Sequence, residues 1–558
     1  MIRNNITLFK DKSDRKEYLL NLIDTPGHVD FSSEVARSLI ACQGVILLVD
    51  ANQGVQAQTV SNFFLAFANN LTVIPVLNKI DLPNANPQSV KEQLQTLFDI
   101  NPNDVILASA KMGIGIDDIF EAVIKQIPPP PIRSGFNTGE KYEHRKCFIL
   151  QDSWYDQFRG TVNLVQVVNG KLQLGDQIQS VKTEMVYTVK SLGLMTPDEI
   201  SVNSLHPGQV GVMACHMKSP RDALIGDTFH EKDNPVSPIL DIKRPHPMVF
   251  AGVYPFEGSE FVKLKDAIDK VCLNDYSVTA VSETSPALGM GWRLGFLGLL
   301  HLEVFSQRLE DEYDAQVLVT TPTVPYKVRL KQRANTGDCN DLVEISNPTQ
   351  WPEAFRIDSC LEPVVTGTII CPHEYVGSIY GLATECRGEQ LSMENIDQLR
   401  VKLEFLLPLN EIVVNFFDRL KSITSGYGSF DYEDAGYRES FLTKVDILIN
   451  DETIPELSTI VHTSRARDKG KEMVSKLKEN LPRQQYLIKV QAATGSKILA
   501  RDDIKPFKKD VLAKLKSNPG GNTGRAMKLL KNQEKGKARL KSIGKVQVSK
   551  ETFIKLLT

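Results

Sequence analysis

The sequence contains no Cys-x-x-Cys pair, and its eight cysteines are scattered along 558 residues. This spacing argues against a zinc ribbon or a redox pair and indicates a reducing compartment. The chain also has no apolar run of the roughly 20 residues that a bilayer-spanning helix needs. With 7% aromatic residues, 24% charged residues and a net charge of −3, the composition is that of an ordinary globular protein and names no partner by itself.

A third absence concerns phosphate binding. Nucleotide switches cradle phosphates with a loop of the form Gly-x-x-x-x-Gly-Lys-Ser/Thr, and no such sequence precedes Asp24. What the chain has there is Asp24-Thr25-Pro26-Gly27-His28, directly after the apolar run 18–23. At the end of a strand, Asp24 can hold Mg²⁺ through water, the N–H of Gly27 can approach a γ-phosphate, and His28 can position an attacking water. The sequence therefore predicts half of a nucleotide switch, with His28 as its catalytic residue.

Two further turns follow predicted strands and carry guanine-binding chemistry. Asn78-Lys79-Ile80-Asp81 follows the strand 73–77, and Ser109-Ala110-Lys111 follows the strand 105–107. A carboxylate such as that of Asp81 accepts hydrogen bonds from both N1–H and the exocyclic amine of guanine, which adenine cannot match. Lys79 is expected along the base, and Asn78 is expected to join the two loops through the Ser109–Ala110 backbone. Each tetrapeptide alone is also compatible with a solvated turn, but three turns at successive strand ends predict a GTP site.

The order of the expected strands and helices, together with a run of prolines, divides the rest of the chain into domains. A hairpin, 5–9 with 18–23, is expected at the edge of a doubly wound parallel sheet, and the prolines at 128–131 end this unit. Short strands with turn signals from 146 to 229 predict a β-barrel or sandwich. The order strand, helix, strand, strand, helix, strand over 247–326 and 362–437 predicts two α+β sandwiches of split βαβ type. His301 and Glu303, two residues apart on the expected helix 297–312, are interpreted as packing and surface residues rather than an acid/base pair.

The C-terminal segment carries a large excess of positive charge. Between Arg501 and Lys545 stand 14 Lys and Arg against four Asp and Glu, whereas the whole chain is slightly acidic. Charge separated in this way is typical of an end that binds a polyanion such as RNA. The residues expected to contact RNA are Arg501, Lys505, Lys508, Lys509, Arg525, Lys528, Lys531, Lys537 and Arg539.

Taken together, these motifs resemble those of a known family. The segments 24–30, 78–81 and 109–111 are similar to the third, fourth and fifth guanine-nucleotide motifs of the translational GTPases. Further segments resemble the LepA family, elongation factor 4, and the likeness runs from the first residue to the last: 289–301 (GMGWRLGFLGLLH), 374–377 (EYVG), 425–432 (SGYGSFDY) and 444–450 (KVDILIN).

The resemblance implies a ribosome-binding GTPase that promotes protein synthesis and fidelity by moving tRNAs back by one codon. GTP is hydrolysed to GDP and phosphate with Mg²⁺, and the partners are ribosomal RNA and tRNA. The chain is expected to act as a monomer and to associate with a membrane only peripherally. Eukaryotic members of the family work in mitochondria, on the matrix side of the inner membrane, whereas a bacterial member is cytoplasmic.

The same resemblance implies an order of domains and a set of site residues. The expected domains are a partial GTP-binding domain (1–128), a β-barrel (143–232), two ferredoxin-like α+β sandwiches similar to domains III and V of elongation factor G (245–328 and 360–438), and a basic C-terminal domain (439–558). The residues expected to bind GTP are Asp24, Thr25, Pro26, Gly27, His28, Asn78, Lys79, Ile80, Asp81, Ser109, Ala110 and Lys111, with Asp24 also holding Mg²⁺ through water.

The first two guanine-nucleotide motifs of the family, with their strand and helix, have no counterpart in the sequence. In a doubly wound sheet that strand lies in the middle, so we expect unpaired strand edges, an apolar gap and nucleotide binding weakened to micromolar or worse. Two interpretations stay open: an incomplete gene model or alternative start whose full product is an active GTPase, or a short isoform that binds ribosomes without hydrolysing GTP. The first is favoured, because a sheet without its central strand is poorly consistent with a folded domain.

Overall fold

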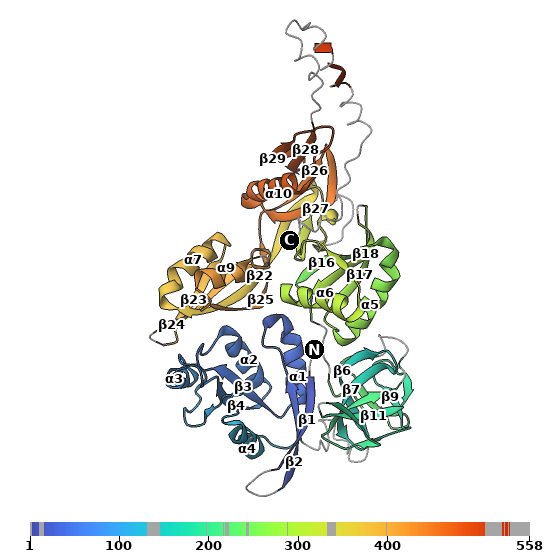
Figure 1. Ribbon diagram of the computed structural model, residues 1–558, viewed down its shortest axis with the longest axis vertical. Coiled ribbons are helices and arrows are strands. Elements are labelled where there is room, and N and C mark those ends of the chain that lie inside the picture. Colours follow the sequence, from blue (N-terminus) through green and yellow to red (C-terminus); the bar gives the residue numbers. More distant parts are fainter. Residues whose placement is uncertain are drawn as a thin grey trace, which may run out of the picture.

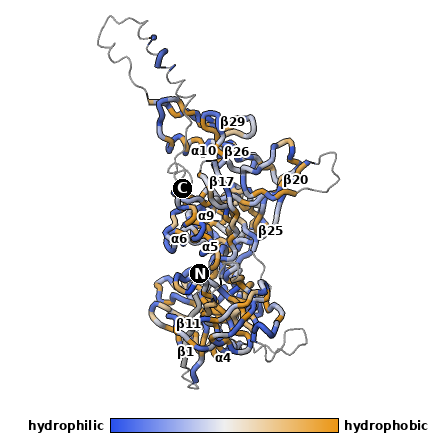
Figure 2. The backbone as a smooth tube through the Cα atoms, turned by 90° about the vertical axis from the view of Figure 1, so that its right-hand side faces the viewer, coloured by the Kyte–Doolittle hydropathy of each residue, from blue (hydrophilic) through white to orange (hydrophobic). Residues whose placement is uncertain are grey.

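The computed structural model describes residues 3–10, 16–130, 146–196, 198–215, 217, 223–240, 245–286, 288–331, 342–397, 399–413, 415–507, 527–528, 531–533 and 535. Its strands and helices form successive units along one long axis, with β1 toward one end and α10 and β29 toward the other (Figures 1 and 2). Among the residues described, none of the helices has the length and apolar character that crossing a membrane requires.

The N-terminal unit contains the predicted parallel sheet. Its strands pair in the order β3 (Gly44–Asp50), β4 (Thr72–Asn78), β5 (Ile106–Leu107), and its helices are α1 (Ser32–Ala41), α2 (Ala57–Ala68), α3 (Pro87–Phe98) and α4 (Ile116–Gln126). Ile74, Val76 and Leu77 of β4 are fully buried, as expected for a central parallel strand. α3 begins where the side chain of Asn86 accepts the backbone N–H of Ser89, with a proline in the first turn.

The hairpin does not extend this sheet, contrary to the prediction. β1 (Arg3–Lys10) and β2 (Glu17–Asp24) pair antiparallel with each other and form a separate two-stranded sheet. The predicted open edges are confirmed: Ile46 and Leu48 of β3 are 37% and 59% exposed, and Leu22 of β2 is 53% exposed. The reason is that no described strand pairs with both β2 and β3, so apolar side chains typical of a buried strand remain uncovered.

A β-rich unit follows, as predicted. Its main sheet has the order β10-β9-β15-β6-β7-β14-β11-β12, and β13 pairs with β8 beside it. The strands are β6 (Cys147–Asp156), β7 (Gly160–Asn169), β8 (Leu172–Gln173), β9 (Gln177–Ser180), β10 (Val186–Thr188), β11 (Ser191–Thr196), β12 (Asp198–Ser201), β13 (Ser204–Leu205), β14 (Val210–Ala214) and β15 (Thr228–Glu231). Alternation along these strands buries a core that includes Phe148, Val165, Leu205 and Phe229.

The two α+β sandwiches share one strand order, although their sequences show no literal repeat. In the first the order is β17-β18-β16-β19, and in the second it is β23-β24-β22-β25. The first contains β16 (Val249–Pro255), α5 (Phe261–Asn274), β17 (Thr279–Ser285), β18 (Gly289–Phe296), α6 (Leu299–Tyr313) and β19 (Val317–Val319). The second contains β22 (Ile357–Pro372), α7 (Val376–Glu385), β23 (Glu389–Asn395), β24 (Arg400–Pro408), α8 (Leu409–Ile412), α9 (Phe416–Ile423) and β25 (Ser429–Glu439), with β20 (Tyr326–Leu330) and β21 (Leu342–Ile345) added at the edge of β22. Each is thus a split βαβ sandwich.

The C-terminal unit is a four-stranded antiparallel sheet with one helix packed on it. The order is β27 (Glu452–His462), β26 (Leu442–Ile449), β28 (Ile488–Thr494), β29 (Lys497–Ile504), and the helix is α10 (Ala466–Asn480). Leu477 of α10 packs with Val445, Ile488 and Val490 of the sheet in one hydrophobic core. The predicted multidomain α/β and α+β fold class is therefore confirmed.

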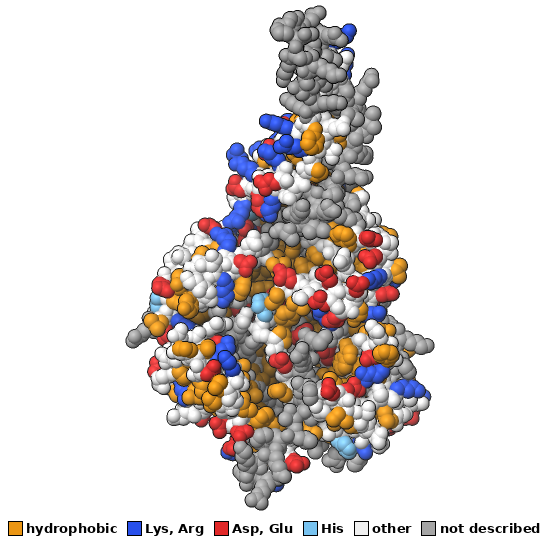
Figure 3. Space-filling model, viewed as in Figure 1, with side chains coloured by type: hydrophobic (Ala, Val, Ile, Leu, Met, Phe, Trp, Pro, Cys, Tyr) orange, Lys and Arg blue, Asp and Glu red, His pale blue; other side chains and the backbone are white. Residues whose placement is uncertain are grey.

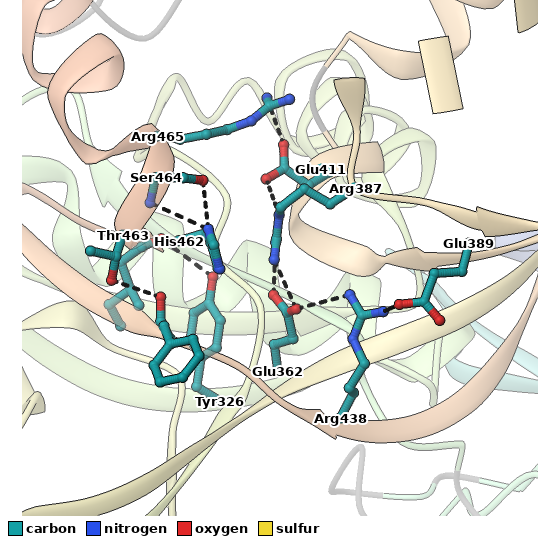
Figure 4. Close-up of polar contacts among 12 residues, drawn as sticks. Tyr326, Glu362, Arg387, Glu389, Glu411, Arg438, His462, Thr463, Ser464 and Arg465 are labelled. Carbon is teal, nitrogen blue, oxygen red and sulfur yellow. Dashed lines mark hydrogen bonds and ion pairs between the residues drawn. The ribbon is translucent and has the colours of Figure 1, made fainter. Parts of the chain in front are cut away.

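A ladder of alternating charges joins the second sandwich to the C-terminal unit (Figure 4). Glu362, whose side chain is 1% exposed, accepts two hydrogen bonds of 2.8 and 2.9 Å from Arg387 and one of 3.3 Å from Arg438. Glu411 then bridges Arg387 (3.1 Å) and Arg465 (2.9 Å), which precedes α10. The two sheets are thereby joined by paired charges around the buried Glu362, in addition to apolar contacts.

Candidate nucleotide site and RNA-binding surface

The two predicted guanine loops lie next to each other at the carboxyl edge of the parallel sheet. Asp50 at the end of β3 is level with Asn78 at the end of β4, and β5 continues the same edge. The side-chain oxygen of Asn78 accepts the backbone N–H of Ala110 at 3.0 Å, and the N–H of Ile80 is bonded to the carbonyl oxygen of Ala108 at 3.4 Å. The prediction that Asn78 joins the two loops is confirmed by this contact.

Asp81 is fixed in place by the neighbouring Ser109 loop. The hydroxyl of Ser109, which is fully buried, donates to Oδ1 of Asp81 at 2.7 Å and accepts the N–H of Met112 at 3.2 Å. Asp81 itself is exposed, and the hydrogen bond from Ser109 to its Oδ1 sets the orientation of the carboxylate. Ala110 and Lys111 are exposed beside it. An exposed carboxylate held in one orientation is the kind of group that can accept donors of a planar base.

Lys79 has a backbone and a partner that the sequence did not predict. Its φ is +64°, which is uncommon for a residue with a Cβ and is frequent at functional sites. Its ammonium lies 2.8 Å from Oδ2 of Asp50. Burial raises the pKa of the Asp50 carboxyl, but hydrogen bonds from Lys79 and from the N–H groups of Asn52 and Gln53 outweigh it, so the pKa lies below its ordinary value. The signal for Asp50 was available, since it ends a strand neighbouring that of Asn78.

The Asp24–His28 segment begins at the last residue of β2, on the separate hairpin. Asp24 and Gly27 are exposed, Thr25 and Pro26 are half-buried, and a Cβ on Gly27 would meet no heavy atom within 4 Å. Nδ1 of His28 accepts the N–H of Asp30 at 3.2 Å, so Nε2 is the ring nitrogen that can face a water. The ring also lies 6.4 Å, edge to face, from that of Phe417 on α9. The structure therefore brings the guanine loops together with one another but does not join them to Asp24–His28 by a strand ladder in the part of the chain that it describes.

The donor groups present fit Mg²⁺ only together with a nucleotide. Asp24 is a single exposed carboxylate, and no group of three His, Cys, Asp or Glu side chains suited to a metal occurs among the described residues. Mg²⁺ commonly keeps several waters and takes one or two carboxylates plus substrate phosphates, so one carboxylate is sufficient where phosphates are also bound. When bound, the ion would neutralise phosphate charge, and Asp24 would orient it through water.

The predicted RNA-contacting residues are only partly within the described structure. Arg501 lies on β29, where it pairs with Asp503 at 3.0 Å, and Lys505, Lys528 and Lys531 are exposed. Lys508, Lys509, Arg525, Lys537 and Arg539 lie outside the described residues. Figure 3 shows Lys and Arg side chains gathered over the C-terminal unit. The exposed cations of α10 also belong to the C-terminal unit but were not among the predicted residues: Arg467, Lys471, Lys476 and Lys478.

Comparison with known proteins finds matches to family models at both ends of the chain. Residues 4–129 match the elongation factor Tu GTP binding domain, residues 359–448 the elongation factor G C-terminus, and residues 449–558 the GTP-binding protein LepA C-terminus. The chain is 51% identical over 546 residues to the human translation factor GUF1, mitochondrial, covering 97% of this chain and 80% of that protein. The chain belongs to the LepA/GUF1 family of translational GTPases.

Other members of the LepA/GUF1 family are similarly close. The GUF1 homologue of Aedes aegypti is 50% identical over 545 residues, covering 97% of this chain and 81% of that protein, and the translation factor waclaw of Drosophila melanogaster is 48% identical over 543 residues, covering 97% and 76%. A crystal structure of a Thermus thermophilus protein aligns with a TM-score of 0.52 at 18% identity, covering 78% of this chain and 89% of that one. This last likeness concerns the fold alone. The predicted family is confirmed, and GTPase activity is the activity of that family.

Proposed function

We propose that this LepA/GUF1 member is a mitochondrial translation factor whose GTP site is built from the loops at Asp24–His28, Asn78–Asp81 and Ser109–Lys111. The observation that carries the proposal is the hydrogen bond between Asn78 and Ala110, which pairs the two predicted guanine loops. Beside it, the exposed carboxylate of Asp81 is held by Ser109. The names of the relatives, which describe mitochondrial translation factors, supply the setting. In this proposal Asp81 binds guanine, Lys79 lies along the base, Gly27 contacts the γ-phosphate and His28 positions the water.

The finer part of the proposal concerns the ribosome. The chain acts as a monomer on ribosomal RNA and tRNA, moves tRNAs back by one codon on mistranslocated ribosomes, and associates peripherally with the matrix side of the inner membrane. The basic surface, formed by the exposed cations of α10 and by Lys505 after β29, supports contact with RNA, because clustered cations release counterions when they meet phosphates. No membrane-spanning helix is needed for such an association.

Replacing Asp81 by Asn tests the nucleotide site. Guanine offers two donors to Asp81, and hydrogen bonds to charged groups contribute about 1.5–3 kcal/mol each, so the unsubstituted chain is expected to prefer GDP to ADP by at least about 100-fold. Asp81→Asn replaces one carboxylate oxygen by an NH2 group, which faces the N–H donors of guanine instead of accepting them. The substitution is expected to reduce this preference to less than about tenfold. Titration calorimetry with both nucleotides measures the ratio.

The matched control is Asp104→Asn, an exposed carboxylate in the loop before β5, at the opposite end of that strand. It is expected to leave the preference unchanged. Equal binding of GDP and ADP by the unsubstituted chain, or a preference that survives Asp81→Asn, would contradict a guanine site at Asp81.

Salt dependence tests the RNA-binding surface. Ribosome affinity measured by co-sedimentation is expected to fall by several orders of magnitude between about 50 and 200 mM salt if six or more phosphates are contacted. Lys505→Gln is expected to lower the slope of log affinity against log salt by about 1. The control Lys125→Gln changes a lysine on α4 whose side chain is 63% exposed, and it should not alter the slope. A flat salt response would rule out the basic surface as the contact.

A second candidate function is a ribosome-binding protein without GTP hydrolysis. The observation that favours it is the divided sheet, in which β2 and β3 are not paired and Leu48 is 59% exposed. Such a protein would use the same sandwiches and basic surface with a weak nucleotide site. Nucleotide affinity separates the two candidates.

A further inference from the structure

A single buried carboxylate, Asp30, caps a helix of the first sandwich. Asp30 lies in the short helix η1 (Val29–Phe31), two residues after His28, and is 3% exposed. Its Oδ2 accepts the backbone N–H of Leu300 at 2.9 Å and that of His301 at 3.3 Å. These two N–H groups belong to the first turn of α6, where a helix has no internal acceptors and favours negative charge. Asp30 thereby ties the Asp24–Phe31 segment to α6.

The other oxygen of Asp30 reaches the second sandwich. The hydroxyl of Tyr432, on β25, donates to Oδ1 at 3.0 Å. Burial and the negative charge of Asp30 raise the pKa of Tyr432, so its proton stays in place to make this bond. Two segments that lie 270 and 402 residues from Asp30 in sequence therefore meet at its side chain.

The start of α6 is shaped to receive this carboxylate. A Cβ at Gly298 would collide with the carboxylate of Asp30, so only glycine leaves room for the contact. His301 is fixed from both sides, because its Nδ1 accepts the N–H of Leu297 at 3.2 Å and its Nε2 lies 2.5 Å from Oδ2 of Asp275. The ring of Phe31 lies 5.9 Å from that of His301. The prediction that His301 is a packing residue is confirmed, and its packing serves this junction.

We propose that Asp30 is a positioning residue that couples the Asp24–Phe31 segment to both sandwiches. The segment that carries Gly27 and His28 cannot shift without breaking three hydrogen bonds to Asp30 or moving α6 and β25 with it. Conversely, a displacement of α6 or of β25 alters the hydrogen bonds of Asp30 and is thereby transmitted to the other sandwich. Asp30 itself need touch neither nucleotide nor water.

Hydrogen exchange of the full chain tests this coupling without nucleotide or ribosome, so its result is independent of the proposed function. The readout is the exchange rate of the N–H groups of Leu300 and His301. Asp30→Ala is expected to speed this exchange by about 10- to 100-fold, because both N–H groups lose a charged acceptor. Tyr432→Phe, which keeps the ring and removes only the hydroxyl, is expected to speed it by about 2- to 10-fold although Tyr432 donates to Asp30 and not to α6.

The double variant makes the test decisive. If Asp30 carries the effect, Tyr432→Phe adds nothing in the Asp30→Ala background, whereas independent effects would multiply. The matched control is Tyr380→Phe, which removes a hydroxyl from α7 in the same sandwich and should leave α6 unchanged. Should Asp30→Ala not fold, Asp30→Asn replaces it in the same cycle, since it keeps the volume and loses the charge. Unchanged exchange at α6 in Tyr432→Phe, or multiplicative effects in the double variant, would overturn the proposal.

Discussion

A GTP titration of the purified chain is expected to give a dissociation constant between the micromolar and millimolar ranges. The chain has no Gly-x-x-x-x-Gly-Lys-Ser/Thr sequence, and the residues described offer Gly27 alone among the predicted phosphate contacts. A nanomolar dissociation constant corresponds to a binding free energy of about −12 kcal/mol. Loss of three hydrogen bonds to charged phosphates removes roughly 5–9 kcal/mol of it if their contributions are additive. In the proposed site, what remains is recognition of the base by Asp81 and Lys79, with Asn78 holding the two loops together.

The control for this titration is Asp81→Ala. If the weak binding takes place at the guanine loops, this substitution should abolish it, whereas an unspecific phosphate site would be unaffected. Saturation at nanomolar GTP would refute the expectation and would mean that phosphate contacts come from residues that the sequence analysis did not assign. No saturation at millimolar GTP would favour the ribosome-binding protein without hydrolysis.

The second large effect is expected at the charge ladder between the second sandwich and the C-terminal unit. Removing one partner of a buried ion pair costs about 3–5 kcal/mol, because the other charge is left buried and unpaired. Glu362→Ala leaves both Arg387 and Arg438 without this acceptor, and their side chains are 18% and 25% exposed. We therefore expect the free energy of unfolding to fall by about 3 kcal/mol, the lower end of this range. Native-state hydrogen exchange of β22 and β24 measures the free energy of unfolding locally.

The pH dependence of this contribution follows from the pKa of Glu362. Burial alone raises that pKa, but the hydrogen bonds and charge of Arg387 outweigh burial and hold it below the ordinary value of 4.5. The stabilisation is therefore complete above pH 4.5 and is lost as the pH falls from 4.5 toward the pKa of the folded state. Glu362→Gln is expected to lack this acid-dependent loss.

The matched control is Glu394→Ala on β23 of the same sheet. Glu394 lies 3.7 Å from Lys402 and its side chain is 64% exposed, so its removal is expected to change the free energy of unfolding by less than about 1 kcal/mol. Equal losses for Glu362→Ala and Glu394→Ala would show that the ladder adds nothing beyond ordinary surface pairs.

Much of the fold was predictable because its signals are local. The parallel strands β3 and β4 appear as apolar runs, and the turns after them contain Asn78 and Asp81 within a few residues. The two sandwiches were predicted from their rhythm of strands and helices, and the structure adds that both have the same strand order. The hairpin was misplaced, since its own sequence says how β1 pairs with β2 but not whether another strand is present for β2 to join.

The sequence by itself determined the turns at Asp24, Asn78 and Ser109, their order along the chain, and the resemblance to the LepA family, which the comparison extends over 97% of the chain. These depend on residues close in sequence, whose spacing is set by strand and turn geometry. Only the tertiary structure decided that Asp30 joins α6 to Tyr432, that Lys79 pairs with Asp50, and that Glu362 lies between two arginines. The physical reason is that a buried carboxylate takes its partners from whichever donors the packed units bring near it, and those donors lie tens to hundreds of residues away.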